Sequence, residues 1–322
     1  MLRPAKERVM HQRWSTQLGR GDDERILIAR SGRIIVSTTN PYRCCAIEPS
    51  GEIAWTVSGV NATREGPDDT LVAKTHDARE LLLLDRDGRT QRRWWLGAQP
   101  ATLVGWRGTT PVFSAVAGCW VDPFIYQLRD NHLYRYDETG ELAEKVPVPI
   151  EPFRAALREL CKTDQAIDKY LRFTQHFTLR CHPRRPCLIA FGTGLHGWLM
   201  RLRPDGTLEW LAAQGPGCCN SICFVGDEVI VHTSSCGRRV SFVSVDGVVF
   251  RSHELDVSRS VSNDQGAVFA IAFDAIRAFD PGGEPTWRLD LAGITAADVR
   301  GTTLYVVTRA SQVLVLTAFD VG

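Results

Sequence analysis

The chain has 322 residues, of which 44% are hydrophobic, and this is enough to bury at least one sizeable core. Its 38 lysines and arginines nearly balance 37 aspartates and glutamates, so the charge excludes the strongly basic surface that nucleic-acid binding requires. No apolar run is long enough to span a membrane, and the first ten residues lack the apolar core of a signal peptide. We therefore expect a cytoplasmic protein that binds neither nucleic acid nor membrane.

From residue 25 onward, one pattern recurs along the chain. A strand of alternating apolar and polar residues ends in a turn that contains glycine, and an aromatic residue usually follows, as Trp55 follows Gly51. Glycine suits such hairpin turns because it accepts a positive φ, and the aromatic residue would pack between neighbouring sheets. A period of about 40 residues built from short strands predicts propeller blades. The turn glycines are Gly51, Gly88, Gly140, Gly206, Gly247, Gly283 and Gly322.

This pattern resembles the quinoprotein-type (PQQ-like) repeat β-propeller family, because a tryptophan follows the turn glycine at Trp55, Trp210 and Trp287. The resemblance implies an all-β, seven-bladed β-propeller that forms a single domain over residues 1–322. The resemblance implies the fold but not the activity, because many members of the family bind no quinone and act as scaffolds. We therefore expect no PQQ and no other cofactor.

The expected blades follow one another along the chain. Blades one and two cover about 25–58 and 70–97, with a polar loop at 59–69 between them. Blade three covers about 101–149 and carries an apolar excursion, residues 117–126, between its second and third strands. Blades four to seven cover about 176–213, 222–255, 267–291 and 302–322, the last together with residues 12–18.

A helical insertion is expected at about 150–175, between blades three and four. Phe153, Leu157 and Ile167 belong to a run with helical spacing. Pro152 suits a first helical position, and Thr163 could cap a second helix.

The N-terminal strand is expected to complete the last blade. The seventh repeat stops at Gly322, before its outer strand, and the segment around Trp14 resembles the outer strand around Trp287. Pairing of the two chain ends would close the ring and protect edges that otherwise aggregate.

The apolar excursion and the helices should emerge on one face, where they would pack together as a cap that is either structural or a docking surface. The first hypothesis is therefore a binding scaffold that presents one loop face and the helical cap to a protein partner. The candidate residues of this face are Trp120, Phe124, Tyr126, Arg43, Arg238 and His176.

The alternative hypothesis is an enzyme with a cysteine- and histidine-lined pocket at the tunnel mouth of the same face, which would take a small-molecule ligand. Thiolate and imidazole are the ligands that zinc and copper prefer. The ten cysteines should be mostly reduced in the cytoplasm, and packing as small apolar residues in the core is the favoured explanation for them. The candidate metal ligands are Cys218, Cys219, Cys236 and His196.

Overall fold

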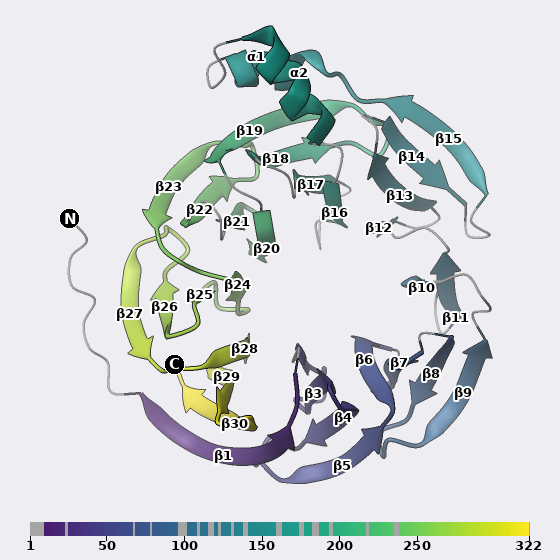
Figure 1. Cartoon of the computed structure of the whole chain (residues 1–322), viewed down its shortest axis with the longest axis vertical. Helices are drawn as coiled ribbons and strands as arrows, with labels where there is room; N and C mark the ends of the chain where they lie inside the picture. The colour runs from purple at the N-terminus through teal and green to yellow at the C-terminus, as the bar shows by residue number, and fades with distance from the viewer. Residues whose placement is uncertain are drawn as a thin grey trace. The chain divides into compact units, whose positions relative to one another are not determined.

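The computed structural model describes residues 10–22, 25–66, 68–77, 79–95, 102–107, 110–114, 119–121, 124–129, 132–137, 141–158, 163–173, 177–181, 187–192, 196–216, 219–234 and 238–321. These residues form 30 strands and two helices (Figure 1). Every described pair of neighbouring strands is antiparallel. The chain groups into two compact units, and the first comprises residues 1–100, 261–279 and 285–322, while the second comprises 101–260 and 280–284.

The first unit holds three complete sheets and most of a fourth. The first sheet contains β1 (His11–Arg20), β28 (Ile294–Arg300), β29 (Thr303–Ala310) and β30 (Val313–Asp320). The second contains β2 (Arg25–Ile28), β3 (Ile34–Thr39), β4 (Tyr42–Ile47) and β5 (Ile53–Ser58). The third contains β6 (Val60–Glu65), β7 (Leu71–Thr75), β8 (Glu80–Leu84) and β9 (Thr90–Trp95). The fourth contains β24 (Arg259–Ser262), β25 (Val268–Ile271), β26 (Ala275–Phe279) and β27 (Pro285–Asp290).

The second unit holds one two-stranded sheet and three four-stranded sheets. The two-stranded sheet contains β10 (Thr102–Arg107) and β11 (Thr110–Ser114). The next contains β12 (Cys119–Val121), β13 (Phe124–Arg129), β14 (His132–Tyr136) and β15 (Leu142–Pro147). The third contains β16 (Phe177–Cys181), β17 (Leu188–Gly192), β18 (His196–Leu202) and β19 (Leu208–Pro216). The last contains β20 (Cys219–Val225), β21 (Val229–Ser234), β22 (Arg239–Ser244) and β23 (Val249–Glu254).

The prediction of a seven-bladed propeller is wrong. Six sheets are blades of four consecutive strands, one further sheet combines β1 with β28–β30, and β10–β11 form an additional two-stranded sheet. Residues 101–149 therefore hold two sheets where one blade was expected, and the expected excursion at 117–126 includes strand β12 and the start of β13. The count failed because all of β10–β11 and the first three strands of the β12–β15 sheet lie between Gly88 and Gly140, with no intervening repeat of the turn pattern.

Several inner strands were also missed. Residues 59–69 were expected to be a loop, but Val60–Glu65 is strand β6. Its sequence is polar and lacks the alternation that marks a strand, yet Val60 and Ala62 are buried against the core of the β2–β5 sheet. Tertiary packing therefore overrides the weak local preference of this segment.

The pairing of the two chain ends is confirmed. Strand β1 runs antiparallel to β30, from His11 opposite Asp320 to Arg20 opposite Val313. Trp14 packs against the cluster that includes Leu314 and Leu316. The outer position of this sheet is thus filled by the N-terminal segment.

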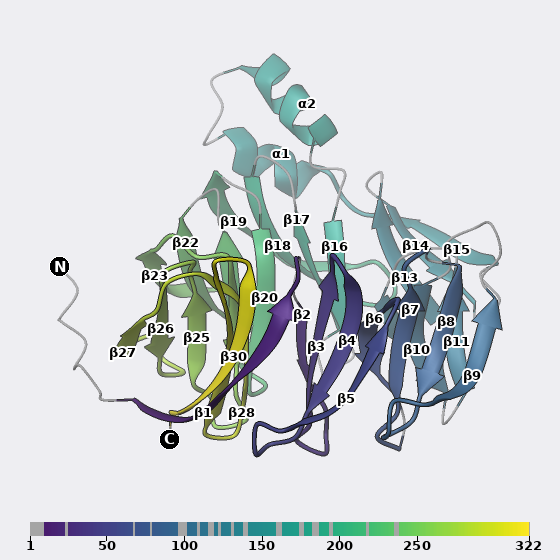
Figure 2. The same ribbon diagram turned by 60° about the horizontal axis from the view of Figure 1, so that its bottom comes forward.

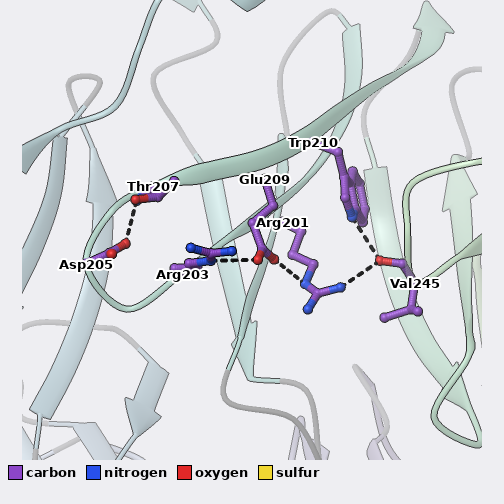
Figure 3. Close-up of polar contacts among 7 residues, drawn as sticks. All are labelled: Arg201, Arg203, Asp205, Thr207, Glu209, Trp210 and Val245. Carbon is purple, nitrogen blue, oxygen red and sulfur yellow. Dashed lines mark hydrogen bonds and ion pairs between the residues drawn. The ribbon is translucent and has the colours of Figure 1, made fainter.

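Tryptophans of outer strands join neighbouring sheets within each unit. The indole Nε1 of Trp14 donates to Pro49 O (2.8 Å), and that of Trp55 donates to Arg86 O (2.8 Å). In the second unit, Trp210 Nε1 donates to Val245 O (2.9 Å), as Figure 3 shows. Each ring also lies on the turn glycine of the next sheet. The predicted role of these aromatics between sheets is confirmed.

The contact around Trp210 is reinforced by an ion-pair network. Arg201 Nη1 donates to the same Val245 carbonyl (3.1 Å) and pairs with Glu209 (Figure 3). Arg203 Nε reaches the second carboxylate oxygen of Glu209 at 2.8 Å. The strand β19 is therefore held against the next turn by both its apolar and its charged residues.

The two helices are α1 (Glu151–Arg158) and α2 (Asp164–Phe173), as the insertion at 150–175 predicted. They stand beyond the ends of the β16–β19 strands (Figure 2). Phe153, Leu157 and Ile167 are buried in one cluster with Leu202. Neither helix exceeds ten residues, and the described part of the chain contains no candidate membrane-spanning helix.

Replacing Thr163 with alanine is expected to lower the free energy of unfolding by about 1 kcal/mol. Thr163 Oγ1 accepts a hydrogen bond from Ala166 N (3.2 Å), so the side chain caps α2 as predicted. Urea denaturation measures the change, and Thr163→Ser, which keeps the oxygen, is the matched control. Equal stability of the alanine and serine variants would contradict a capping role.

Candidate functional site

Each four-stranded sheet has two different ends. The turn glycine lies at one end, between the third and fourth strands, and we call this the turn end. The loop between the second and third strands lies at the other end, from which the fourth strand also leaves for the next sheet. We call this the loop end, and it is where the sequence placed the binding face.

Three exposed aromatic rings lie at loop ends of the first unit, and a fourth, Phe250 at 43%, lies at a turn end of the second unit. Tyr42 is 37% exposed at the β3–β4 turn, Trp95 is 66% exposed at the end of β9, and Phe273 is 70% exposed between β25 and β26. They come from three different sheets. Aromatic side chains that remain in water are unusual in core-forming repeats and common in binding surfaces.

Main-chain hydrogen bonds hold the loops that carry this surface. Gly59 N donates to Tyr42 O (2.8 Å), and His76 N donates to Gly59 O (3.0 Å). The rings of Tyr42 and His76 consequently meet edge to face, with centroids 6.0 Å apart. Asp77 Oδ1 accepts from Thr75 Oγ1 (2.7 Å) and from the main chain of residue 79, and these bonds, the threonine bond first, lower the pKa of Asp77. These bonds hold the described parts of the loops in place.

Two arginines lie close to Tyr42, Arg43 beside it in β4 and Arg20 at the end of β1. Arg43 Nη2 donates to Arg20 O (3.1 Å), and its buried Nε has no hydrogen-bond partner. Asp22 accepts from Arg309 (3.1 Å) and Asn40 (3.2 Å), so this carboxylate is already paired. No ion pair is found for Arg20 within the described residues. The arrangement leaves positive charge for an outside group, and it places the predicted candidate Arg43 at the loop end.

The loop ends of the second unit carry Arg238 and the helices. Arg238 Nε lies 3.7 Å from Asp256 Oδ2, and both side chains are largely exposed. Arg154 of α1 pairs with Asp168 of α2 at 2.8 Å, which ties the helices to each other. His176, predicted for this face, lies outside the described residues.

The apolar candidates near the helices belong to the interior. Tyr126 is 3% exposed and lies in the cluster that contains Phe153 and Leu157, so the expectation of an exposed patch is corrected for this residue. Burial raises the pKa of its hydroxyl. Phe124 packs on the same cluster with the Arg135 guanidinium 4.5 Å from its ring centroid. Trp120 lies in β12, and its side chain is not described.

The described cysteines are structural. Cys44, Cys45 and Cys187 are buried, and burial raises the pKa of Cys44 to about 12, which keeps its thiol protonated. The Sγ of Cys223 lies 3.6 Å from Ser260 Oγ. Cys181 is disulfide-bonded, to a cysteine whose side chain the structure does not describe.

Nothing in the described part of the structure places the candidate metal ligands close to one another. Cys218 and Cys236 lie outside the described residues, and Cys219 and His196 lie in β20 and β18 with side chains that are not described. Within the described residues, no group of three potential metal-ligating side chains is found. The metal-dependent enzyme hypothesis stays a prediction.

A small pocket lies at the turn ends of the β2–β5 and β6–β9 sheets. Ser31, Arg33, Thr70 and Arg86 are among its lining residues. The Arg33 guanidinium donates to the Arg86 carbonyl and pairs with Glu48. This cation joins two sheets, so its guanidinium is already paired within the protein.

Sequence reasoning missed the three exposed aromatic residues. For Trp95 a signal existed, because adjacent residues of a strand point to opposite faces and the pair Trp94-Trp95 must therefore expose one ring more than the other. Tyr42 begins β4 and Phe273 stands in the short loop between β25 and β26, and neither position shows any such pattern.

No protein-family model matches the chain, and no curated protein matches its sequence. Among solved structures, the chain is similar to virginiamycin B lyase from Staphylococcus aureus, at 9% identity and a TM-score of 0.56 over 95% of this chain and 99% of the lyase chain. It is also similar to BBS1N in complex with ARL6DN, at 9% identity and a TM-score of 0.58 over 98% of both chains. A catalytically inactive variant of the same lyase, with quinupristin, matches at 10% identity and a TM-score of 0.54, over 94% of this chain and 98% of that one.

These similarities show a β-propeller fold. At this level of identity they show the fold alone, because the same architecture supports unrelated functions. One similar structure is an enzyme by its name, and another is a protein bound to a protein partner. The function must therefore be argued from the residues of this chain.

Proposed function

We propose that this protein is a cytoplasmic binding scaffold whose loop ends contact a protein partner. The observation that carries the proposal is the set of exposed rings of Tyr42, Trp95 and Phe273, which come from three sheets of one unit and share its loop ends. Tryptophan, tyrosine and arginine dominate the energetic centres of protein interfaces. Arg43 and Arg20 lie beside Tyr42 and would supply the polar part of such a contact.

The helical insertion of the second unit is a second element of the proposed scaffold. Its apolar side is buried in the core cluster, while Glu151, Ala155 and Arg158 of α1 remain exposed. The two helices are docked on the core and have a charged outer surface. Such a surface suits a polar contact with a partner better than it suits the role of an apolar lid. The complex of BBS1N with ARL6DN shows that a protein of similar fold binds a protein partner. It does not indicate which partner this chain binds.

The repeat itself is proposed to be of the quinoprotein type. Indole groups that donate to the main chain of the next turn, at Trp14, Trp55 and Trp210, support this assignment. In a scaffold the repeat needs to hold loops in place, and these contacts hold neighbouring sheets together.

Placing a photo-crosslinking amino acid at Tyr42, Trp95 or Phe273 is expected to trap one discrete protein partner in the cells from which the chain derives. The same group at Ile53 or Val248, which are exposed near turn ends, is the matched control. With the trapped partner purified, Trp95→Ala is expected to weaken binding by about 30-fold, which corresponds to about 2 kcal/mol for a central aromatic residue. Calorimetric titration measures this loss. Equal crosslinking at both ends of the sheets, or unchanged affinity of Trp95→Ala, would contradict the proposal.

A further inference from the structure

Cys181, the last residue of β16, is disulfide-bonded. The bond requires a second cysteine, and the structure gives four of the ten cysteines as thiols, namely Cys44, Cys45, Cys187 and Cys223. The five that remain have side chains that the structure does not describe, and they are Cys119, Cys161, Cys218, Cys219 and Cys236. The partner is therefore identified from the strands that bring each candidate toward Cys181.

Cys181 lies at the turn end of β16, on the face toward the β12–β15 sheet. Its side chain packs against the core cluster that contains Leu179 of the same strand and Tyr126 of β13. A disulfide joins cysteines whose Cα atoms lie within about 7 Å, because a longer separation cannot be bridged without moving the backbone. The partner must therefore lie near the turn end of this sheet or of the sheet that packs on this face.

Cys119 meets both conditions. It begins β12, which contacts β16 and lies beside it at the inner edges of the two sheets (Figure 1). The register pairs Cys119 with Tyr126, and directly paired residues share a face of the sheet. Cys119 therefore belongs to the face that packs on the β16–β19 sheet. Val121, two residues further on, pairs with Phe124 next to the turn, so Cys119 is also near the turn end.

The other four candidates belong to loop ends. Cys219 is the first residue of β20, Cys218 precedes it, and Cys236 lies in the connection between β21 and β22. Cys161 lies in the connection between the two helices, which follow the loop end of β15. A strand of the length of β16, five residues, separates the two ends of a sheet by about 13 Å. This separation exceeds the reach of a disulfide.

We propose that Cys119 and Cys181 form a disulfide that crosslinks the inner strands of two neighbouring sheets and that opens and closes with the redox conditions. The bond forms by exchange with a small-molecule disulfide such as oxidised glutathione. One protein thiolate attacks that disulfide and releases one reduced glutathione, and the second protein thiolate then displaces the other. The two cysteines together lose two protons and two electrons, which leave on the two molecules of reduced glutathione.

The crosslink closes a covalent loop of about 60 residues, which contains β13–β15 and both helices. Strand β12 gains most from it, because it has three residues and its described backbone pairing is with β13. In the cytoplasm proposed above, reducing conditions would keep the bond open until oxidised disulfides accumulate. The inference goes beyond the loop-end contact, because it gives the core cluster on which the helices are docked two covalent states.

Peptide mapping of the full chain, alkylated without reduction and digested with trypsin, tests the pairing. Trypsin releases residues 181–184, which contain Cys181 and no second cysteine. The expected result is a link between this peptide and residues 108–129, whose one cysteine is Cys119, and the link should disappear on reduction. A link to residues 159–162 or 202–238, which hold the other candidates, or no link at all, would overturn the assignment.

Glutathione buffers test the redox dependence. Raising the ratio of oxidised to reduced glutathione is expected to form the crosslink, and dithiothreitol is expected to remove it. Reduction should lower the thermal midpoint by about 8 °C and should speed hydrogen exchange of the β12 amides at least tenfold. Cys119→Ser should melt at the reduced midpoint under both conditions, whereas the matched control Cys161→Ser should keep the shift.

An unchanged midpoint and unchanged exchange on reduction of the parent chain would overturn the proposed role of the crosslink. This comparison needs no variant, so it holds even where Cys119→Ser fails to fold. All of these measurements use the protein without a partner. Failure of the loop-end proposal is therefore distinguishable from failure of this one.

Discussion

Gly247→Val is expected to lower the free energy of unfolding by about 4 kcal/mol, the sum of a strained backbone and an overpacked contact. Gly247 has a φ of +87°, a conformation that β-branched residues strongly disfavour. A Cβ at this position would lie 2.6 Å from the indole of Trp210. The ring would have to leave the turn, and the hydrogen bond from Trp210 to Val245 would be lost with it.

Gly226→Ala is the control that measures the cost of the positive φ without a side-chain clash. Gly226 also has a positive φ, +57°, but a Cβ there would meet nothing within 4 Å. This variant should cost only about 1 kcal/mol. Urea denaturation followed by tryptophan fluorescence compares the two. If both variants lost the same stability, the contact between the turn glycine and the indole would not hold the sheets together.

Acidification from pH 7 to pH 5 is expected to remove about 2 kcal/mol of stability through His232 alone. This side chain is fully buried in β21, and neither ring nitrogen has a hydrogen-bond partner. Burial, with a smaller contribution from Arg239, lowers its pKa from 6.5 to about 4. The unfolded chain therefore binds a proton near pH 6.5 while the folded chain does not. The contribution of the neutral imidazole is fully present above pH 6.5 and is lost as the pH falls toward 4.

His232→Leu should remove this dependence. The leucine has no titratable group and leaves no donor unpaired, so the variant is expected to be at least as stable as the parent at pH 7. The difference in unfolding free energy between pH 7 and pH 5 should shrink by about 2 kcal/mol. His11→Gln, at an exposed position of β1, is the matched control and should leave the difference as it is. If the pH dependence of stability persisted in His232→Leu, groups other than His232 would be responsible for it.

The outer half of each blade could be predicted from the sequence. The turn glycine, the strand before it and the aromatic residue after it form a local pattern, and Trp55 and Trp210 lie where that pattern placed them. The inner strands could not be predicted in the same way. Strand β6 carries Asn61, Arg64 and Glu65, and only its contact with the neighbouring sheet makes it a strand.

The candidate site was predicted in outline. Arg43 and Arg238 lie at loop ends, because the alternation of strands fixes the end of the sheet at which each loop emerges. Tyr126 was misplaced, since an apolar segment looks the same whether it covers the surface or fills the core. The candidates Cys218, Cys236 and His176 lie outside the described residues, so their predicted roles stay predictions.

The sequence by itself determined that the chain is built of repeated antiparallel sheets, that β1 completes the sheet of β28–β30, and that two helices follow β15. These features follow from turn chemistry and from spacing along the chain, which are local. Only the tertiary structure decided the number of sheets, the two-stranded β10–β11 and the rings that stay exposed, because pairing and burial depend on which surfaces meet. Trp55 and Trp95 show the difference: both end up on outer strands, but one lies on a turn glycine of the next sheet and the other stands largely in water.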